Sequence, residues 1–128
     1  MPYSREKKKK IIGSLIENLE RQRGLIFVDY KGLKTKDLEE LKSKLKEIQA
    51  KFAVVKKTLF RIASEKSHKE LSEGINALEG QLAVVFAFGD ETAAVKSVYG
   101  FSKKNENLKI SGGFFENIFR EKEEIITI

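Results

Sequence analysis

The amino-acid sequence predicts an α+β sandwich in which two β-α-β units share one sheet. Three observations favour this fold class. Four apolar segments have the branched and aromatic content of strands, they alternate with segments of helical periodicity, and the order β-α-β occurs twice along the chain. A doubly wound parallel sheet is the competing architecture, because it is built from the same alternation of elements.

The first predicted element is a helix over residues 5–22, which precedes both units. Its apolar positions form one stripe, namely Ile11, Ile12, Leu15, Ile16 and Leu19. Ser4 can cap the start, and Gly24 stands where a left-handed C-terminal cap is expected. A run of four lysines, Lys7, Lys8, Lys9 and Lys10, wraps around the first turns. Positive charge there opposes the helix dipole, so a bound anion would relieve it, although a solvated, frayed terminus is the alternative.

The first β-α-β unit is predicted over residues 25–55. Residues 25–30 are an almost continuous apolar run, as expected for a strand buried on both faces. The Lys31-Gly32-Leu33 turn follows, and Thr35 can cap the next helix, which carries a narrow leucine stripe. Residues 52–55 form the second strand, and the branched side chains of Val54 and Val55 are expected to be buried.

The stretch Val54–Ala63 (VVKKTLFRIA) joins this strand to another helix through a cationic corner. Thr58 can cap a helix that extends to about residue 66. The apolar positions expected to face inward are Leu59, Ile62 and Ala63. Lys56 and Lys57 occupy the corner and Arg61 follows one turn later, so backbone donors and cations can converge on a phosphate. An ordinary turn with solvated lysines is the alternative interpretation.

The second β-α-β unit begins after a weaker helical pattern over residues 67–80, marked by Leu71, Ile75 and Leu78. Residues 82–88 are the clearest strand and are expected at the centre of the sheet. Asp90 can cap a helix over residues 91–103, and a fourth strand over residues 108–115 carries paired glycines that suggest a bulge. The sum is one domain, residues 1–128, with a ferredoxin-like split β-α-β sandwich, an extra N-terminal helix and a short helical insertion.

Charge is distributed unevenly along the chain. The net charge is +6, but residues 1–66 carry a net +9 and residues 67–128 a net −3. A positive excess confined to one half indicates a basic face for a polyanion, either nucleic acid or a membrane surface. There is no cysteine, and the longest apolar run, residues 82–88, is far below the about 20 residues that span a bilayer. We therefore expect a cytoplasmic protein without a membrane partner.

Catalytic chemistry has little support in the sequence. The single histidine, His68, lies in a polar stretch, and no spacing of residues predicts a metal or cofactor site. A small acyl-phosphate hydrolase on the same fold would need an arginine in a glycine-rich loop after the first strand, which is absent. We expect a binding protein with no cofactor, and not an enzyme.

Three segments, in order and at the right spacing, resemble the large-subunit ribosomal stalk-base protein family, called L-ten in bacteria and P-zero in archaea and eukaryotes. Val28–Leu33 is similar to its V-x-Y/S-R/K-G-L motif, and VVKKTLFRIA to its V-V-K/R-N-T-L-x-x-x-A motif, with Lys57 in place of Asn. The segment from Leu78 to Gly113 follows the remaining order, with Gln81 in place of the usual Pro. Lys34 stands where the family tends to have a capping Thr.

The resemblance implies a structural protein that binds large-subunit rRNA beside ribosomal protein L-eleven, at the base of a stalk that supports translational GTPase recruitment. In the family a C-terminal helical spine carries L-seven/L-twelve dimers. This chain ends about where that spine begins, so we expect these dimers only if a spine exists beyond residue 128. The chain is then either truncated or naturally short.

A free-standing single-strand RNA-recognition domain is the alternative function, because residues 26–30 also resemble the first-strand motif of that family. Its third-strand motif needs a cation, a glycine and alternating aromatics, whereas the segment from Gly80 offers no cation and no aromatic ring until Phe86. For either function the expected contacts are mainly electrostatic, to phosphates. The predicted RNA-binding residues are Lys7, Lys8, Lys9, Lys10, Lys31, Lys56, Lys57, Thr58 and Arg61.

Overall fold

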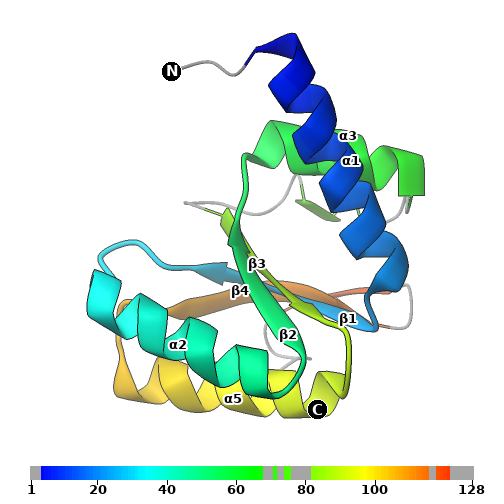
Figure 1. The fold of residues 1–128 in the computed structure, drawn as a ribbon. Helices are drawn as coiled ribbons and strands as arrows, with labels where there is room; N and C mark the ends of the chain where they lie inside the picture. The colour runs from blue at the N-terminus through cyan, green and yellow to red at the C-terminus, as the bar shows by residue number, and fades with distance from the viewer. Residues whose placement is uncertain (1–3, 68–70, 72–73, 76–81, 116–117, 122–128) are drawn as a thin grey trace.

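A computed structural model describes residues 4–67, 71, 74–75, 82–115 and 118–121 of the chain (Figure 1). His68 and Leu78 lie outside the described residues. The helices and strands follow in the order α1 (Arg5–Arg21), β1 (Gly24–Asp29), α2 (Thr35–Glu47), β2 (Ala50–Val54), α3 (Lys57–Ser67), β3 (Leu82–Ala87), α5 (Glu91–Lys104), β4 (Lys109–Phe115) and β5 (Ile118–Glu121).

The strands form one sheet in the order β2-β3-β1-β4-β5, and all neighbours are antiparallel. Because β1 and β2 both run antiparallel to β3, they are parallel to each other with β3 between them. In the same way β3 and β4 flank β1. Both β-α-β units are therefore split, which confirms the ferredoxin-like sandwich and makes the doubly wound parallel alternative wrong. The edge strand β5 has no counterpart among the predicted elements.

Helices cover both faces of the sheet (Figure 1). In β1, Ile26 and Val28 face the cluster made with α2 and α5, whereas Leu25 and Phe27 face the cluster made with α1 and α3. Alternate side chains of a strand point to opposite faces, so a strand between two helical layers must be apolar throughout. This explains the continuous apolar runs of β1 and β3, which are the central strands as predicted.

The α1–α3 side of the sandwich is rich in aromatic residues. Phe27, Phe60, Phe86 and Phe114 are fully buried there. The rings of Phe27 and Phe60 meet edge to face at 5.9 Å between centroids, and those of Phe60 and Phe86 are tilted to each other by 50° at 6.4 Å. Two residues of the predicted insertion, Leu71 and Ile75, are also fully buried in this cluster.

The helix starts confirm two of the predicted caps and correct two. Ser4 Oγ accepts the Lys7 N–H at 3.2 Å, and Asp90 Oδ1 accepts the Thr92 N–H at 2.9 Å. Thr35 is not a cap, because α2 begins at that residue and the extended Lys34 precedes it without a side-chain cap. Thr58 is not a cap either, because α3 already begins at Lys57.

Two glycine predictions have opposite outcomes. Gly24 is the first residue of β1 rather than a left-handed cap, and a Cβ there would lie 2.6 Å from the ring of Phe115. The prediction of a bulge in β4 is confirmed. Phe27 pairs with Gly112 and Val28 with Ile110, so Ser111 is the extra residue.

No helix within the described ranges combines the length and the hydropathy needed to cross a membrane.

Candidate nucleic-acid interface

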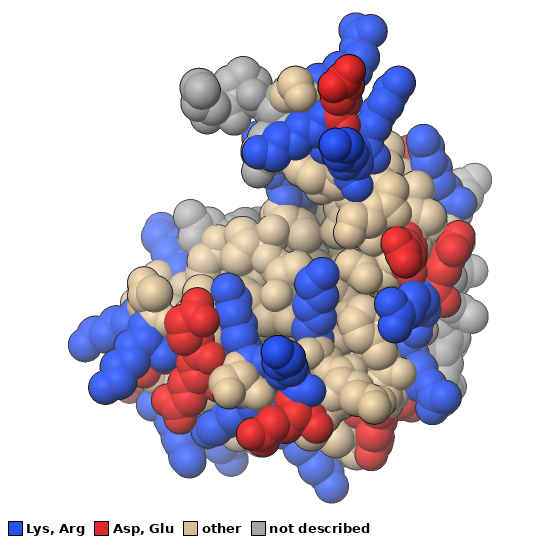
Figure 2. Space-filling model, viewed as in Figure 1, with Lys and Arg blue, Asp and Glu red and all other residues tan. Residues whose placement is uncertain are grey.

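The lysine run lies on the first turns of α1, where Lys7, Lys8, Lys9 and Lys10 are all exposed. Further along the helix, Leu15 and Leu19 are buried in the cluster shared with α3, which fixes α1 on the sheet. The beginning of α1 projects past α3 at the top of the molecule, and basic side chains gather there (Figures 1 and 2). The run therefore presents its charge to solvent from an anchored helix.

The corner between β2 and α3 carries the second basic group. Lys56, Thr58 and Arg61 are exposed and Lys57 is half-buried. The carbonyl of Lys56 accepts the Phe60 N–H at 3.0 Å, which starts the helix, and the first turn of α3 contains no acidic residue. The first N–H groups of an α-helix have no acceptor inside the helix, so backbone donors and cationic residues occur together at this helix start.

Tertiary packing joins these two groups. Leu15 and Leu19 of α1 share one apolar cluster with Leu59, Phe60 and Ala63 of α3, so both helices lie in one layer on the same side of the sheet. We call the predicted residues on this layer the α1–α3 basic surface. It consists of Lys7, Lys8, Lys9, Lys10, Lys56, Lys57, Thr58 and Arg61.

Lys31 lies apart from the α1–α3 basic surface, in the turn between β1 and α2. Its N–H donates to Asp29 Oδ1 at 3.0 Å, and Gly32 has a φ of +86°, which favours glycine. A Cβ at position 32 would also lie 3.2 Å from Asn107 Oδ1. Lys31 lines a cavity of about 350 Å³ together with Asp29, Glu106, Asn107 and Lys109. Lys31 therefore has carboxylates beside it in this cavity.

Two apolar side chains that the sequence places in the core are partly exposed. Val54 is 54% exposed because it is the last residue of β2, an edge strand, and lies beyond Phe52, which the α2–α5 cluster buries. Ile62 is 36% exposed although its neighbour Ala63 is fully buried, since only one face of α3 meets the sheet. The expectation of burial was wrong for both.

Another cationic group, which is not among the predicted residues, lies between α2 and α5. Lys44 of α2 and Lys96 and Lys104 of α5 line one cavity on the face of the sheet opposite to the α1–α3 basic surface. The signal in the sequence is the last three turns of the predicted helix 91–103, where every charged residue is a lysine.

The geometry argues against two other functions. Single-strand recognition on a sheet needs aromatic rings on an open sheet face, but Phe27 and Phe86 are fully buried beneath α1 and α3. Among the described residues, no group of three or more His, Cys, Asp or Glu is placed to hold a metal ion.

Comparison with known proteins identifies one family. Residues 3–103 match the family described as Ribosomal protein L10. The large ribosomal subunit protein uL10 of Carboxydothermus hydrogenoformans is 36% identical over 124 residues, which cover 96% of this chain and 69% of that protein. The uL10 of Alkaliphilus oremlandii is 33% identical over 111 residues, with coverages of 87% and 65%. The uL10 of Staphylococcus aureus strain JH9 is 33% identical over 124 residues, with coverages of 96% and 73%.

Proposed function

The chain belongs to the ribosomal protein L10 family, and from this premise we propose that it binds large-subunit rRNA at the base of the ribosomal stalk. Membership of this family makes it a structural protein of the large ribosomal subunit and not an enzyme. Its site is therefore to be understood as a binding surface, and rRNA is the polyanion that such a surface meets in a ribosome.

The observation that carries this proposal is the α1–α3 basic surface. Two segments that are far apart in the sequence place their cations on one helical layer, and the first turn of α3 adds backbone donors beside Lys57. Phosphate contacts of this kind supply most of the affinity of a nucleic-acid complex, and structured RNA is recognised largely by shape and backbone. We expect Lys31 to add a separate contact from the β1–α2 turn, apart from this surface.

Partners follow from the same proposal. Beside the rRNA we expect ribosomal protein L-eleven at the stalk base, in the cytoplasm, with residues 1–128 acting as the rRNA-binding domain. Recruitment of translational GTPases would need L-seven/L-twelve dimers, which require a helical spine beyond this chain.

The test is the salt dependence of binding to a stalk-base rRNA fragment. The variant Lys56→Gln/Lys57→Gln/Arg61→Gln removes three charges from the α1–α3 basic surface. We expect the affinity to fall by more than about tenfold and the slope of log K against log salt to become shallower by about 2.

A matched control removes the same charge elsewhere. Lys36, Lys42 and Lys51 are exposed and lie outside the α1–α3 basic surface. Their triple Gln variant should lose much less affinity. Equal losses in both variants would show that only net charge matters, and an unchanged slope in the first variant would remove its three residues from the site.

A further inference from the structure

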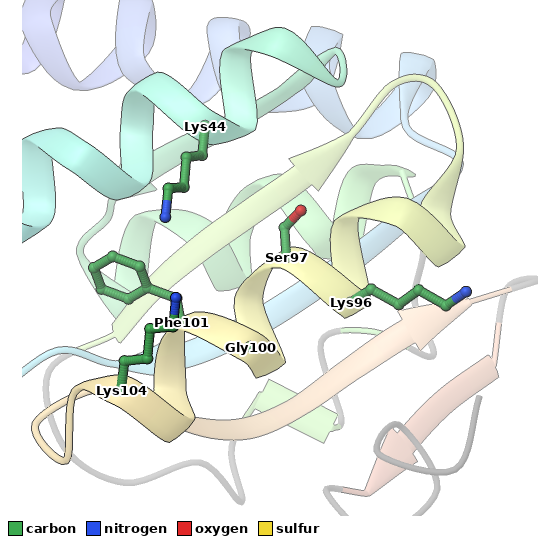
Figure 3. Close-up of a pocket in the computed structure, with 6 residues that line it drawn as sticks. All are labelled: Lys44, Lys96, Ser97, Gly100, Phe101 and Lys104. Atoms are coloured by element: carbon green, nitrogen blue, oxygen red, sulfur yellow. The ribbon is translucent and has the colours of Figure 1, made fainter.

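The cationic cavity between α2 and α5 is a groove of about 260 Å³, here called the α2–α5 lysine groove. Its lining residues are Lys44, Lys96, Ser97, Gly100, Phe101 and Lys104. Figure 3 shows the side chains of Lys44 and Lys104 directed toward the Phe101 ring, with Lys96 extending toward the other end of α5. The groove lies on the opposite face of the sheet from the α1–α3 basic surface.

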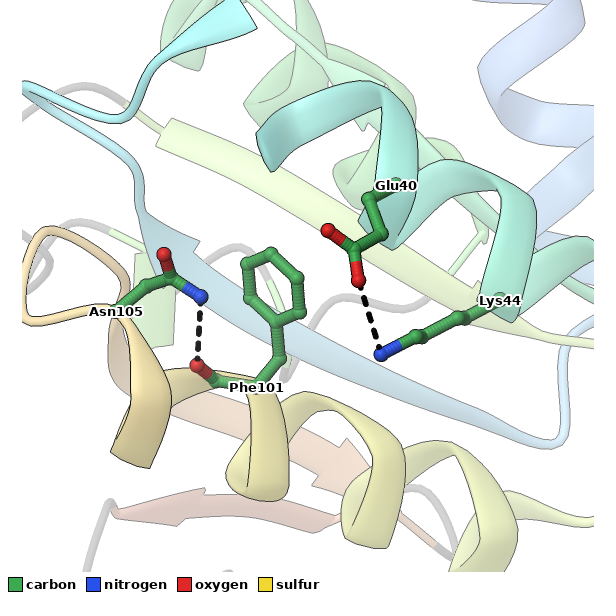
Figure 4. Close-up of polar contacts among 4 residues, drawn as sticks. All are labelled: Glu40, Lys44, Phe101 and Asn105. Atoms are coloured by element: carbon green, nitrogen blue, oxygen red, sulfur yellow. Dashed lines mark hydrogen bonds and ion pairs between the residues drawn. The ribbon is translucent and has the colours of Figure 1, made fainter. Parts of the chain in front are cut away.

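The groove exists because small residues leave α5 open between the lysines. Gly100 has no side chain, and a Cβ built there would meet no atom within 4 Å. Phe101 is only 5% exposed, so its ring forms part of the floor, and Lys44 Nζ lies over that ring at 5.8 Å from the centroid. The carbonyl of Phe101 is already bonded to the backbone and side-chain N–H groups of Asn105, which closes the end of α5 (Figure 4).

The electrostatics of the groove favour an anion. None of its lining residues is a carboxylate, and three of the six are lysines, with Lys44 and Lys104 at one end of the groove and Lys96 extending toward the other (Figure 3). Lys44 pairs with Glu40 at 3.3 Å, but both side chains are about half exposed (Figure 4). Exposed pairs of this kind contribute at most about 1 kcal/mol, so Lys44 can turn to a phosphate at low cost.

Helix electrostatics account for only part of this arrangement. Lysines in the last turn of a helix complement its dipole, which is sufficient to explain Lys104. Lys44 lies in the last turn of α2 and complements the dipole of that helix in the same way, whereas Lys96 lies two turns before Lys104 and is not explained by the dipole of α5.

We propose that the α2–α5 lysine groove binds the phosphate backbone of RNA, as a second contact on the face opposite to the α1–α3 basic surface. This inference rests on the proposed function and adds to it that the protein is held between two RNA segments. The eight helical steps from Lys96 to Lys104 span about 12 Å of helix, a length that suits consecutive phosphates of a strand better than one small anion.

The lining of the groove favours RNA over an acidic protein. Stable protein interfaces are centred on apolar or aromatic anchors and are poor in lysine. The large apolar side chains that the described residues expose are Val54, Ile62 and Ile118, and none of them lines the groove.

The first test is the variant Lys44→Gln/Lys96→Gln/Lys104→Gln of the whole chain, measured with the same rRNA fragment. We expect the salt slope to become shallower by about 2 and the affinity to fall at least about tenfold, with an unchanged circular dichroism spectrum. The Lys36/Lys42/Lys51 variant again serves as the control for net charge.

A second test adds charge instead of removing it. Because position 100 has open space, Gly100→Glu and Gly100→Gln should both fold, and they differ only in charge. Gly100→Glu should bind the fragment at least about fivefold more weakly than Gly100→Gln, since it brings a carboxylate among the three lysines. Equal affinities of these two variants would overturn the electrostatic role of the groove.

The outcomes separate this inference from the proposed function. No binding of the fragment by the wild-type chain overturns both. Binding that depends on Lys56, Lys57 and Arg61 but not on the groove lysines overturns the groove alone. The groove variant could also retain RNA binding but lose binding to poly-glutamate. That result would assign the groove to an acidic polypeptide and overturn the proposal.

Discussion

The two helical layers of this protein both display lysines, but they arrange them differently. On α2, Lys42 and Lys44 each pair with a carboxylate one turn earlier, at 3.7 Å and 3.3 Å. On α1, four consecutive lysines follow a single acidic residue, Glu6. The comparison teaches that the number of lysines on a surface says little about function, because carboxylates on the same helix can neutralise them locally.

The cores beneath the two layers differ as well. The α1–α3 side holds four fully buried phenylalanines among its leucines, and the rings of Phe27, Phe60 and Phe86 are in contact, whereas the α2–α5 side consists mainly of leucine, valine and alanine with three phenylalanines that are 5–7% exposed. Ring contacts add about 0.5–1.5 kcal/mol each beyond the area that they bury. The layer that carries most of the predicted RNA contacts is thus also held to the sheet by its aromatic side chains.

The largest expected effect contrasts the two cores. Phe60→Ala should lower the free energy of unfolding by about 3–5 kcal/mol, because it empties a fully buried site and removes the contacts with Phe27 and Phe86. Leu45→Ala is the matched change in the other layer. It should lower the free energy of unfolding by a smaller amount, in the range of about 2–5 kcal/mol. Urea unfolding measures both, and a larger loss for Leu45→Ala would remove the special weight given to the aromatic core.

A smaller effect separates two glycines. Gly24→Ala should destabilise by about 1–3 kcal/mol, because the new Cβ would lie 2.6 Å from the Phe115 ring and 3.0 Å from Glu91 Cβ. Gly13→Ala in α1 meets nothing within 4 Å and should stabilise by about 0.5–1 kcal/mol through helix propensity. Thermal unfolding shows the signs, and the same sign for both would mean that the packing at Gly24 relaxes freely.

The smallest effect concerns the start of α2. Lys34→Ser supplies the side-chain acceptor that the N-cap lacks and should stabilise by about 1 kcal/mol. Thr35→Ala should change stability by only a few tenths of a kcal/mol, because Thr35 is the first helical residue. If Thr35→Ala instead cost as much as the loss of a cap, the helix would begin one residue later than the structure places it.

Much of the fold was predictable from the sequence, and the failures have definite causes. Ser4 and Asp90 were predicted correctly as caps because their side-chain oxygens accept hydrogen bonds from backbone N–H groups no more than three residues away. The predicted caps Thr35 and Thr58 were wrong by one or two positions, because each of these helices begins earlier than the threonine pattern indicates. Val54 failed because branching predicts a strand but does not tell which strand lies at the edge.

The residues of the candidate site were chosen from the sequence, but their arrangement could not be. The sequence marked the α1 lysines and the β2–α3 corner as separate groups, and only the packing of α1 against α3 placed them in one layer. The structure places Lys31 away from both groups, in a cavity that Asp29 and Glu106 also line. The α2–α5 lysine groove was missed because Lys44 and Lys96 belong to different β-α-β units.

The sequence by itself determined the type and order of most elements, the positive half of the chain and the resemblance to its family. These properties depend on hydrophobic period, capping residues and charge, which act over a few neighbouring positions. The tertiary structure alone decided which face each helix covers, which strands form the edges and which lysines converge. Those features arise from contacts between segments distant in sequence, and a local pattern carries no record of them.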